Sequence, residues 1–358
     1  MIPKPEQMFN IYDYYLGARI TEGNAARRAL LTEAGATTYG EVHAAAGAIA
    51  AMLRDVGVEP GDRVIVALDD GVPYVAAFFG ILRAGAVVVM VNPHLPPGQI
   101  AYFYDYTTPR VALVAGDALG GFEAAAKLSK HAPRRIVSDG AAFEEVLAAS
   151  GSSDASIPAY PTLASDPAVF LFSGGTTGHP KAVVQSHRSF ANTTELYGKR
   201  VLEMAPDDIT LSVPKLYFGY ATGTNLLFPF AAGATSALFP ERCTTETLFE
   251  KIALFRPTVL VNVPTMVNHL VGHPGASQQD VSSLRLATSA GEALPAELHR
   301  RWDETFGVPL LDGLGTAEMW HIFISNRPDD VRPGTLGRPV EGFEVHACDD
   351  DGDDVPIN

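Results

Sequence analysis

The sequence predicts an α/β fold of two stacked lobes, each with a mainly parallel sheet covered by helices, followed by the start of a small β-barrel unit. Residues 38–58 have the apolar spacing of a helix and lead into a β-branched strand, EPGDRVIVALDD. Residues 72–93, VPYVAAFFGILRAGAVVVMVNP, repeat the order of helix, glycine and strand. The residue pattern of 83–93 recurs loosely at 231–241, AAGATSALFPE. The similarity is too weak to define a repeat, but it predicts a second lobe built like the first. Alternating helices and strands favour parallel sheets with both faces covered.

The domain boundaries follow from a connector and a change in composition. PRVALVAGD and RRIVSDG add two short strands to the first lobe, predicted at residues 1–150. Residues 150–168 are rich in Ser, Pro and Ala, as is typical of a connector. The second lobe is predicted at residues 168–325, and the turn-rich residues 326–358 are predicted to begin the β unit with short antiparallel strands. The acidic residues 349–354 lack the EF-hand pattern, so a hairpin turn is favoured over a calcium loop.

The composition argues against several classes of protein. The chain has 358 residues, of which 47% are hydrophobic and 19% charged, so it is globular and not disordered. A formal net charge of −15 argues against nucleic acid or an anionic membrane as the main partner. Cys243 and Cys348 have no metal-ligand spacing and indicate a reducing, cytoplasmic environment. We expect no signal peptide and no membrane span, because Arg83 and Gly85 interrupt the most apolar run.

A glycine-rich loop, SGGTTGHPK at residues 173–181, joins two strand candidates. It is not a Walker loop, because Ala182 follows Lys181 where that motif needs Ser or Thr. It is not a hydrolase nucleophile elbow either, because Leu171 stands where the first glycine is needed. Two interpretations remain: a plain surface loop, or a cradle whose backbone N–H groups and hydroxyls bind a polyphosphate beside Lys181. The candidate phosphate-binding residues are Ser173, Gly174, Gly175, Thr176, Thr177 and Gly178.

The longer stretch SGGTTGHPKAVVQSHRS resembles the signature loop of the adenylate-forming superfamily, which includes acyl-CoA synthetases, adenylation domains and luciferases. Three further segments are similar to family motifs and occur in the family's order. They are SVPKLYFGYATGTNLLFPF at 212–230, ATSAGEALP at 287–295 and LLDGLGTAEMWHIFISN at 310–326. The resemblance covers essentially the whole chain and is most specific to benzoate-CoA ligases and hydroxybenzoate relatives.

Matching positions imply roles on the ATP side of the site. Lys181 and Thr316 would act on the phosphates, and Glu318 would contribute to catalysis by contacting Mg²⁺. Taken singly, Glu318 also fits a helix N-terminal acid and Gly291 a turn former, but their joint occurrence with the loop favours the functional interpretation. The residues implied on the adenine side are Ser289, Ala290, Gly291, Glu292, Asp312 and Gly313.

The resemblance also implies an acyl pocket for an acid without an α-amino group. Amino-acid adenylation domains place an aspartate in the first pocket segment, whereas KLYFGYATG contains no carboxylate. The implied pocket would be small, flat and largely aromatic, which suits a planar aryl ring. Its residues are Gly219, Tyr220, Trp320, His321 and Ile322. For His321 the alternative is a core histidine hydrogen-bonded to the backbone.

The implied function is ATP-dependent activation of a benzoate-like acid to an acyl adenylate, followed by transfer to coenzyme A. Carboxylate and α-phosphate repel each other, so Mg²⁺, lysine and oriented donors must disperse the charge. One alternative is a freestanding enzyme that loads the acyl group onto the thiol of a carrier protein. Another is a non-catalytic module that only binds an aryl acid. A homodimer is compatible with the sequence.

The sequence departs from the family pattern in two places. Ala317 stands where the family commonly has threonine, so the phosphate contact would fall to Thr316. The family's ribose-binding aspartate, hinge and catalytic lysine have no counterpart before Asn358. We therefore expect these residues to be the large N-terminal domain of a longer enzyme, without the mobile C-terminal domain and with poor turnover by itself.

Overall fold

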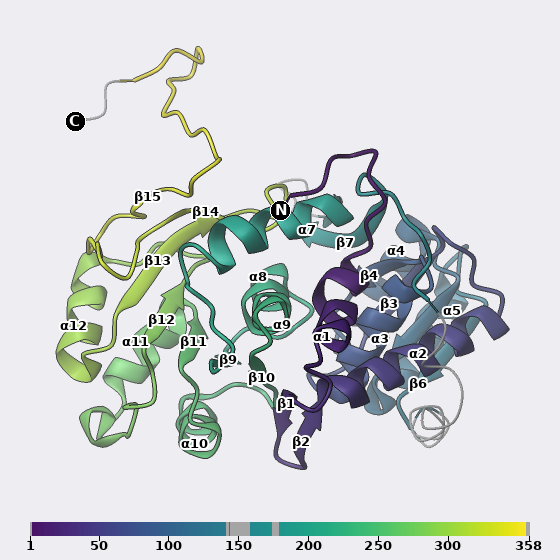
Figure 1. Cartoon of the computed structure of the whole chain (residues 1–358), viewed down its shortest axis with the longest axis horizontal. Coiled ribbons are helices and arrows are strands. Elements are labelled where there is room, and N and C mark those ends of the chain that lie inside the picture. Colours follow the sequence, from purple (N-terminus) through teal and green to yellow (C-terminus); the bar gives the residue numbers. More distant parts are fainter. Residues whose placement is uncertain (1, 141–142, 144–157, 174–178, 356–358) are drawn as a thin grey trace.

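The computed structural model describes residues 2–140, 143, 158–173 and 179–355. Two sheets lie side by side along the long axis of the molecule, with helices between and outside them (Figure 1). Most neighbouring strands in both sheets run parallel, so the predicted α/β class is confirmed.

The six-stranded sheet has the order β6-β5-β3-β4-β7-β8, and only β7 and β8 pair antiparallel. Its strands are β3 (Arg63–Ala67), β4 (Val87–Met90), β5 (Val111–Val114), β6 (Arg135–Ser138), β7 (Pro167–Ser173) and β8 (Lys181–Ser186). Two helices cover its inner face, α2 (Tyr39–Asp55) and α3 (Val72–Arg83). Its outer face is covered by α4 (Pro97–Thr107) and α5 (Leu119–Leu128). The turn η2 (Gly116–Ala118) precedes α5.

The nine-stranded sheet has the order β15-β14-β13-β12-β11-β9-β10-β1-β2, with antiparallel strands at its two ends. Its strands are β1 (Arg28–Thr32), β2 (Gly35–Thr38), β9 (Ile209–Ser212), β10 (Thr235–Ala237), β11 (Val259–Asn262), β12 (Leu286–Ser289), β13 (Leu310–Gly315), β14 (Ile322–Ser325) and β15 (Arg338–Pro339). Its outer face packs against α10 (Thr245–Phe255), α11 (Pro264–Gly272) and α12 (Ala296–Phe306). The turn η7 (Ala276–Gln278) follows α11.

Shorter helices fill the space between the sheets. They are η1 (Asp13–Gly17), α1 (Ala18–Thr21), α7 (His187–Thr193), η5 (Thr194–Gly198), α8 (Gly219–Thr222), η6 (Gly223–Leu227) and α9 (Phe228–Ala232). The π-helical η6 joins α8 and α9 into one continuous helical segment at the centre of Figure 1.

The sheets do not divide the chain as the ranges 1–150 and 168–325 predicted. β1 joins the nine-stranded sheet, where Leu30 lies opposite Ser236 of the parallel strand β10. β7, which follows the connector, joins the six-stranded sheet through β4. Each sheet therefore takes strands from both sides of residues 150–168, because pairing between distant strands decides membership and local patterns carry no information about it.

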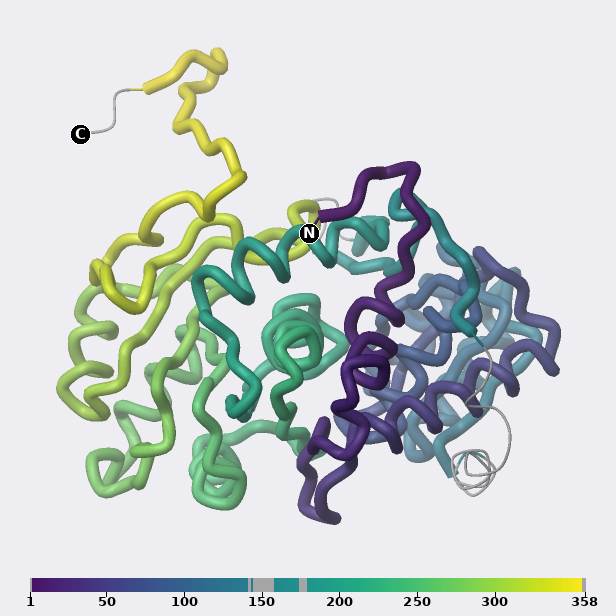
Figure 2. Tube along the Cα trace, in the orientation of Figure 1, coloured from purple at the N-terminus to yellow at the C-terminus, as the bar shows by residue number. Residues whose placement is uncertain are grey.

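The end of the described chain extends the nine-stranded sheet by one short strand. β15 pairs antiparallel with β14, and the residues after it run away from the body of the molecule (Figure 2). Cys348 and Asp354 form an isolated antiparallel bridge. Between them the Asp349 carboxylate accepts backbone hydrogen bonds from Asp351 and Asp353, both at 3.0 Å. This acidic stretch therefore forms the predicted hairpin turn.

Two helices show how the sequence fixes local structure. α2 starts with a capping box, in which Thr38 Oγ1 accepts from the Glu41 N–H and the Glu41 carboxylate accepts from the Thr38 N–H. α3 begins with Pro73 in its first turn and ends before Gly85, whose φ of +78° is left-handed. A Cβ at Gly85 would also lie 2.6 Å from the Tyr160 ring, so only glycine fits this turn.

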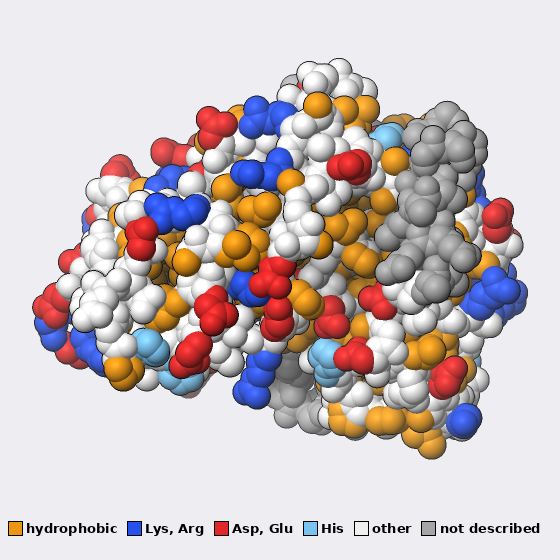
Figure 3. Space-filling view, turned by 90° about the horizontal axis from the view of Figure 1, so that it is seen from below, with side chains coloured by type: hydrophobic (Ala, Val, Ile, Leu, Met, Phe, Trp, Pro, Cys, Tyr) orange, Lys and Arg blue, Asp and Glu red, His pale blue; other side chains and the backbone are white. Residues whose placement is uncertain are grey.

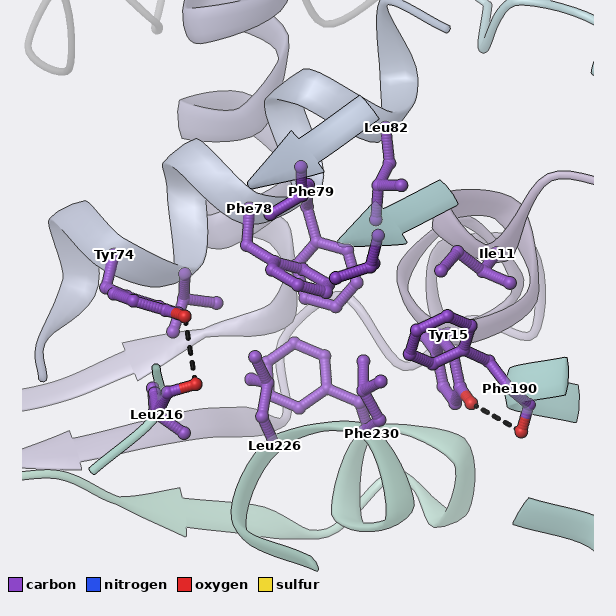
Figure 4. Close-up of a cluster of buried hydrophobic side chains, with 14 of the residues drawn as sticks. Ile11, Tyr15, Tyr74, Phe78, Phe79, Leu82, Phe190, Leu216, Leu226 and Phe230 are labelled. Carbon is purple, nitrogen blue, oxygen red and sulfur yellow. Dashed lines mark hydrogen bonds between the residues drawn. The ribbon is translucent and has the colours of Figure 1, made fainter. Parts of the chain in front are cut away.

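The largest hydrophobic cluster lies between the two sheets and joins them. In Figure 4, Phe79 of α3 stacks on Phe230 of α9, with ring centroids 5.3 Å apart. Tyr39 meets the same Phe230 ring edge-on at 5.0 Å. Full burial of each such ring stabilises the fold by about 1.5–3 kcal/mol. The lobes are therefore packed together through a buried aromatic contact.

The surface in Figure 3 mixes the two signs of charge. On this face the lysines and arginines that the structure describes are scattered among acidic side chains and do not gather into one basic area. Within the described residues, no helix has the length and apolar character needed to cross a membrane.

Candidate active site

A cavity of about 450 Å³ opens where the two sheets meet. Its walls come from the end of β7, the segment between β9 and α8, the residues after β12, and the connection from β13 to β14. The predicted residues that line it are Gly219, Tyr220, Ala290, Gly291, Thr316, Trp320, His321 and Ile322. Lining residues that the sequence analysis did not assign to the site are Leu171, Phe172, Val213, Pro214, Tyr217, Phe218, Val263, Gly315 and Ala317.

The inner end of the cavity is aromatic. Trp320 packs edge-on against Phe190 at 4.4 Å, and its φ of 68° places it in the left-handed region that few non-glycine residues adopt. The His321 ring lies 5.2 Å from that of Trp320 and 5.5 Å from that of Tyr220. These rings offer faces and edges to a ligand, which favours a flat apolar group.

His321 is held in one orientation by hydrogen bonds. Its Nε2 atom lies 3.1 Å from the Tyr220 carbonyl oxygen and 3.1 Å from Thr224 Oγ1. Because a carbonyl only accepts, Nε2 carries the proton and Nδ1 is bare. Burial lowers the pKa of His321 to about 4, so the ring is neutral at pH 7. The backbone hydrogen bond that the sequence analysis kept as an alternative is present, and His321 also lines the cavity.

The hydroxyl of Tyr220 is also used within the protein. It lies 2.6 Å from Thr288 Oγ1 of β12. Burial raises the pKa of Tyr220 well above its usual value, so the phenol stays protonated. At Gly219 a Cβ would make ordinary van der Waals contact with Leu171, at 3.4 Å, so the position lies against the opposite wall of the cavity. Tyr220 and Gly219 therefore shape the cavity and offer it no free charge.

The connection that carries Thr316 and Glu318 is fastened to β8. Gln185 of β8 is buried, and its Nε2 donates to the carbonyl oxygens of Ala317 at 2.6 Å and Glu318 at 3.2 Å. Thr316 Oγ1 accepts a hydrogen bond from the Met319 backbone N–H at 3.1 Å. Thr316 and Glu318 are exposed at this rim. Gln185 was missed by sequence analysis, although it lies on the strand that begins with Lys181.

Lys181 and Ser173 lie opposite each other where the β7–β8 hairpin opens. Lys181 lies four positions before Gln185 on β8, about 13 Å along the strand, so the strand that carries Lys181 also contacts the Glu318 connection. His179 stacks on Tyr102 of α4 at 5.1 Å, and Tyr102 donates to the Pro180 carbonyl at 2.7 Å. The predicted Gly174, Gly175, Thr176, Thr177 and Gly178 lie outside the described residues.

Three polar residues stand in register on neighbouring parallel strands: Asn262 and Ser289 end β11 and β12, and Asp312 lies within β13. All three are buried; the Ser289 hydroxyl and the Asp312 carboxylate lie close to each other, and Asn262 Nδ2 has no hydrogen-bond partner within the described chain. Burial raises the pKa of Asp312 to about 6, although the Ser289 hydroxyl lies close enough to lower it. Since buried polar atoms are nearly always paired, this row fits a polar ligand such as an adenine ring. Asn262 was not predicted.

Two other residues predicted on the adenine side have clear local contacts. Glu292 is exposed, and its carboxylate accepts a hydrogen bond from Thr265 Oγ1 at 2.7 Å. Gly313 allows β14 to lie close to β13, because a Cβ there would be 3.0 Å from Ile322 Cγ2. Ser289, Glu292, Asp312, Gly313, Glu318, Lys181 and Ser173 do not line the cavity but lie on the elements that border it.

The residues at the rim fit a magnesium ion that a nucleotide brings with it. Among the described residues no group of three or more His, Cys, Asp or Glu side chains is placed to hold a metal by itself. Mg²⁺ is commonly bound by one or two carboxylates together with substrate phosphates. The exposed carboxylate of Glu318, two residues after Thr316, is suited to that arrangement.

Several known proteins are similar to this chain in sequence and architecture. Residues 18–358 match the protein family described as AMP-binding enzyme. A benzoate–CoA ligase of Thauera aromatica is 34% identical over 98% of this chain and 67% of its own length. The solved anthranilate CoA ligase in complex with anthranoyl-AMP has a TM-score of 0.93 and 34% identity, covering 98% of this chain and 67% of that one.

A solved benzoate CoA ligase from Burkholderia xenovorans has a TM-score of 0.89 and 36% identity, covering 98% of this chain and 69% of that one. The chain thus spans about two thirds of the length of these relatives. A family match over most of the chain agrees with the loop and the three motifs found in the sequence. The chain belongs to the family of AMP-binding, adenylate-forming enzymes.

Proposed function

We propose that the protein activates an aromatic carboxylic acid with ATP and transfers the acyl group to coenzyme A, as an AMP-forming arylcarboxylate–CoA ligase. The observation that carries the proposal is the aromatic cavity, which lies beside the carboxyl ends of β12 and β13. In open α/β sheets this edge is where nucleotides bind. The relatives that share the fold act on benzoate and anthranilate.

The reaction has two steps. A carboxylate oxygen of the acid attacks the α-phosphorus of ATP, an O–P bond forms, and the bond to pyrophosphate breaks. The thiol of coenzyme A then adds to the acyl carbon and loses its proton, while AMP leaves. When bound, Mg²⁺ disperses phosphate charge.

This chain's residues would orient the reactants. Tyr220, Trp320 and His321 would hold the ring, while Lys181 and Thr316 would hold the phosphates at the cavity mouth. Glu318 would place the magnesium, and the row of Asn262, Ser289 and Asp312 would face the adenine. Holding two repelling anions in line supplies much of the rate in such reactions.

ATP–pyrophosphate exchange tests the proposal. The complete gene product is incubated with labelled pyrophosphate, ATP and a panel of neutral and substituted benzoates. We expect exchange that depends on the aryl acid and is lost with Lys181→Ala. Absence of exchange with every aryl acid, in a folded protein that binds ATP, would refute the proposed function and favour a non-catalytic binding module.

The acceptor is tested separately. Coenzyme A and a phosphopantetheinylated carrier protein are offered to the preformed acyl adenylate, and thioester formation is measured. We expect coenzyme A to be the better acceptor, in line with the relatives named above. The opposite preference would identify a carrier-loading enzyme. We further infer a cytoplasmic enzyme whose main partners are small molecules, because a net charge of −15 disfavours nucleic acid and anionic membranes.

A further inference from the structure

The wall of the cavity between β9 and α8 has no regular secondary structure. Val213, Pro214, Tyr217 and Phe218 of this segment line the cavity. Leu216 is not among the lining residues and is fully buried. An irregular buried segment must find partners for its peptide groups outside a helix or strand.

The backbone N–H and the carbonyl of Leu216 both form hydrogen bonds with side chains of the six-stranded lobe. The Leu216 N–H donates to Asp70 Oδ1 at 2.9 Å. The Tyr74 hydroxyl donates to the Leu216 carbonyl at 2.9 Å, as Figure 4 shows. Asp70 precedes α3 and Tyr74 lies in its first turn. One short segment of the six-stranded lobe therefore binds both the N–H and the carbonyl of Leu216. Thr222 adds a second hydroxyl to the same carbonyl at 2.6 Å.

Lys215, the residue before Leu216, is held by contacts with Phe239, which follows β10. Lys215 Nζ donates to the Phe239 carbonyl at 2.6 Å and lies 3.6 Å from the centroid of the Phe239 ring. Burial raises the pKa of Asp70 to about 7, while the charge of Lys215 lowers it and that of Asp69 raises it. An Asp70 carboxyl oxygen accepts the hydrogen bond from the Leu216 N–H in either protonation state, so this contact does not require a charge on Asp70.

We propose that Asp70 and Tyr74 are positioning residues of the aryl-acid pocket, which hold Leu216 across the lobe interface and thereby fix Tyr217 and Phe218 against the substrate ring. The inference rests on the proposed function of the cavity. Neither residue lines the cavity. Their effect on the substrate therefore passes through the wall, and they should govern the fit of the acid and not that of ATP.

The test compares graded variants in ATP–pyrophosphate exchange by the complete gene product with benzoate. Asp70→Ala removes the acceptor, Asp70→Asn keeps an acceptor oxygen, and Tyr74→Phe removes only a hydroxyl. We expect Asp70→Ala to raise the KM for benzoate on the order of tenfold and Tyr74→Phe about threefold. Asp70→Asn should return to within about twofold of the unsubstituted protein, and the KM for ATP should stay within about twofold throughout.

Tyr39→Phe is the matched control. Tyr39 also lies in the six-stranded lobe, is fully buried, and donates to a carbonyl across the interface, that of Ala234 at 2.6 Å. It should lower the Tm about as much as Tyr74→Phe without changing the KM for benzoate. If Asp70→Ala does not fold, Tyr74→Phe and Tyr39→Phe still decide the question.

Three results would overturn the proposal: unchanged benzoate KM in the folded variants, equal loss in Asp70→Asn and Asp70→Ala, or an equal rise in the ATP KM. Each of these leaves the exchange activity of the unsubstituted protein intact. Failure of the proposed function is different, because the unsubstituted protein would then show no exchange with any aryl acid.

Discussion

Gly223→Ala should destabilise the protein, because the added methyl group would overpack the contact between η6 and the rings of His321 and Trp320. A Cβ at position 223 would lie 2.4 Å from His321 Cδ2, 2.5 Å from His321 Nε2 and 2.9 Å from the Trp320 ring. His321 cannot withdraw freely, because it is bound to the Tyr220 carbonyl and packs edge-on against Phe228 at 4.8 Å. The methyl group must therefore displace the imidazole or the helix.

The magnitude follows from three terms. Overpacking of a well-filled core costs about 1–3 kcal/mol. Breaking the hydrogen bond of His321 costs about 1 kcal/mol more. Replacing glycine by alanine in a helix returns about 1 kcal/mol. We therefore expect a net loss of about 1–3 kcal/mol in the free energy of unfolding, with weaker binding of the aryl acid because the displaced ring enters the cavity.

Urea unfolding followed by tryptophan fluorescence measures the loss. Gly120→Ala is the control, since Gly120 lies in α5 and a Cβ there meets no atom within 4 Å. That change should be neutral or stabilising. Equal unfolding midpoints for the two variants, or a Gly223→Ala protein with unchanged affinity for the acid, would refute the packing argument.

Three further predictions concern single side chains. Gln185→Ala leaves the carbonyls of Ala317 and Glu318 without the side-chain donor. It should lower the free energy of unfolding by about 1–3 kcal/mol and raise the KM for ATP more than the KM for the acid. Equal effects on the two KM values would contradict this prediction. Burial lowers the pKa of His321 and His187 to about 4, below the unfolded value of 6.5, so the stability that they contribute is complete above pH 6.5 and is lost as the pH falls to 4. Urea midpoints at pH 7 and pH 4.5 check this, and His187→Asn should reduce the difference. Tyr220→Phe should cost about 1 kcal/mol of stability with little change in acid affinity, whereas Tyr220→Ala should weaken acid binding by about 1 kcal/mol or more in calorimetry.

The elements that follow from neighbouring residues could be predicted from the sequence. The capping box of Thr38 and the glycine stop at Gly85 act within a few residues, and α2 and α3 lie where the pattern indicates. Sheet membership could not be predicted, because β1 finds its partner β10 far along the chain. No local signal distinguishes that pairing from one with β3.

The candidate site divides in the same way. Tyr220 and His321 were predicted because they lie in motifs that resemble a known family, and both line the cavity. Gln185 and Asp70 were missed because their importance comes from contacts with Glu318 and Leu216, more than a hundred residues away. Burial of a polar side chain on a short strand or at a helix start is the signal that could have suggested them, and it appears only in the folded structure.

Specificity for the ring should come from shape more than from hydrogen bonds. The Tyr220 hydroxyl is bound to Thr288, and the proton of His321 points to a backbone carbonyl. No Asp, Glu, Lys or Arg of the described chain lines the cavity. An apolar pocket discriminates weakly against a neutral isostere that adds one hydroxyl, but a charged ring substituent would be buried without a partner at a cost of several kcal/mol. A pocket of this geometry should therefore tolerate small neutral substituents on an aryl acid and exclude a second carboxylate, with the limit on size set by the wall that Leu216 anchors.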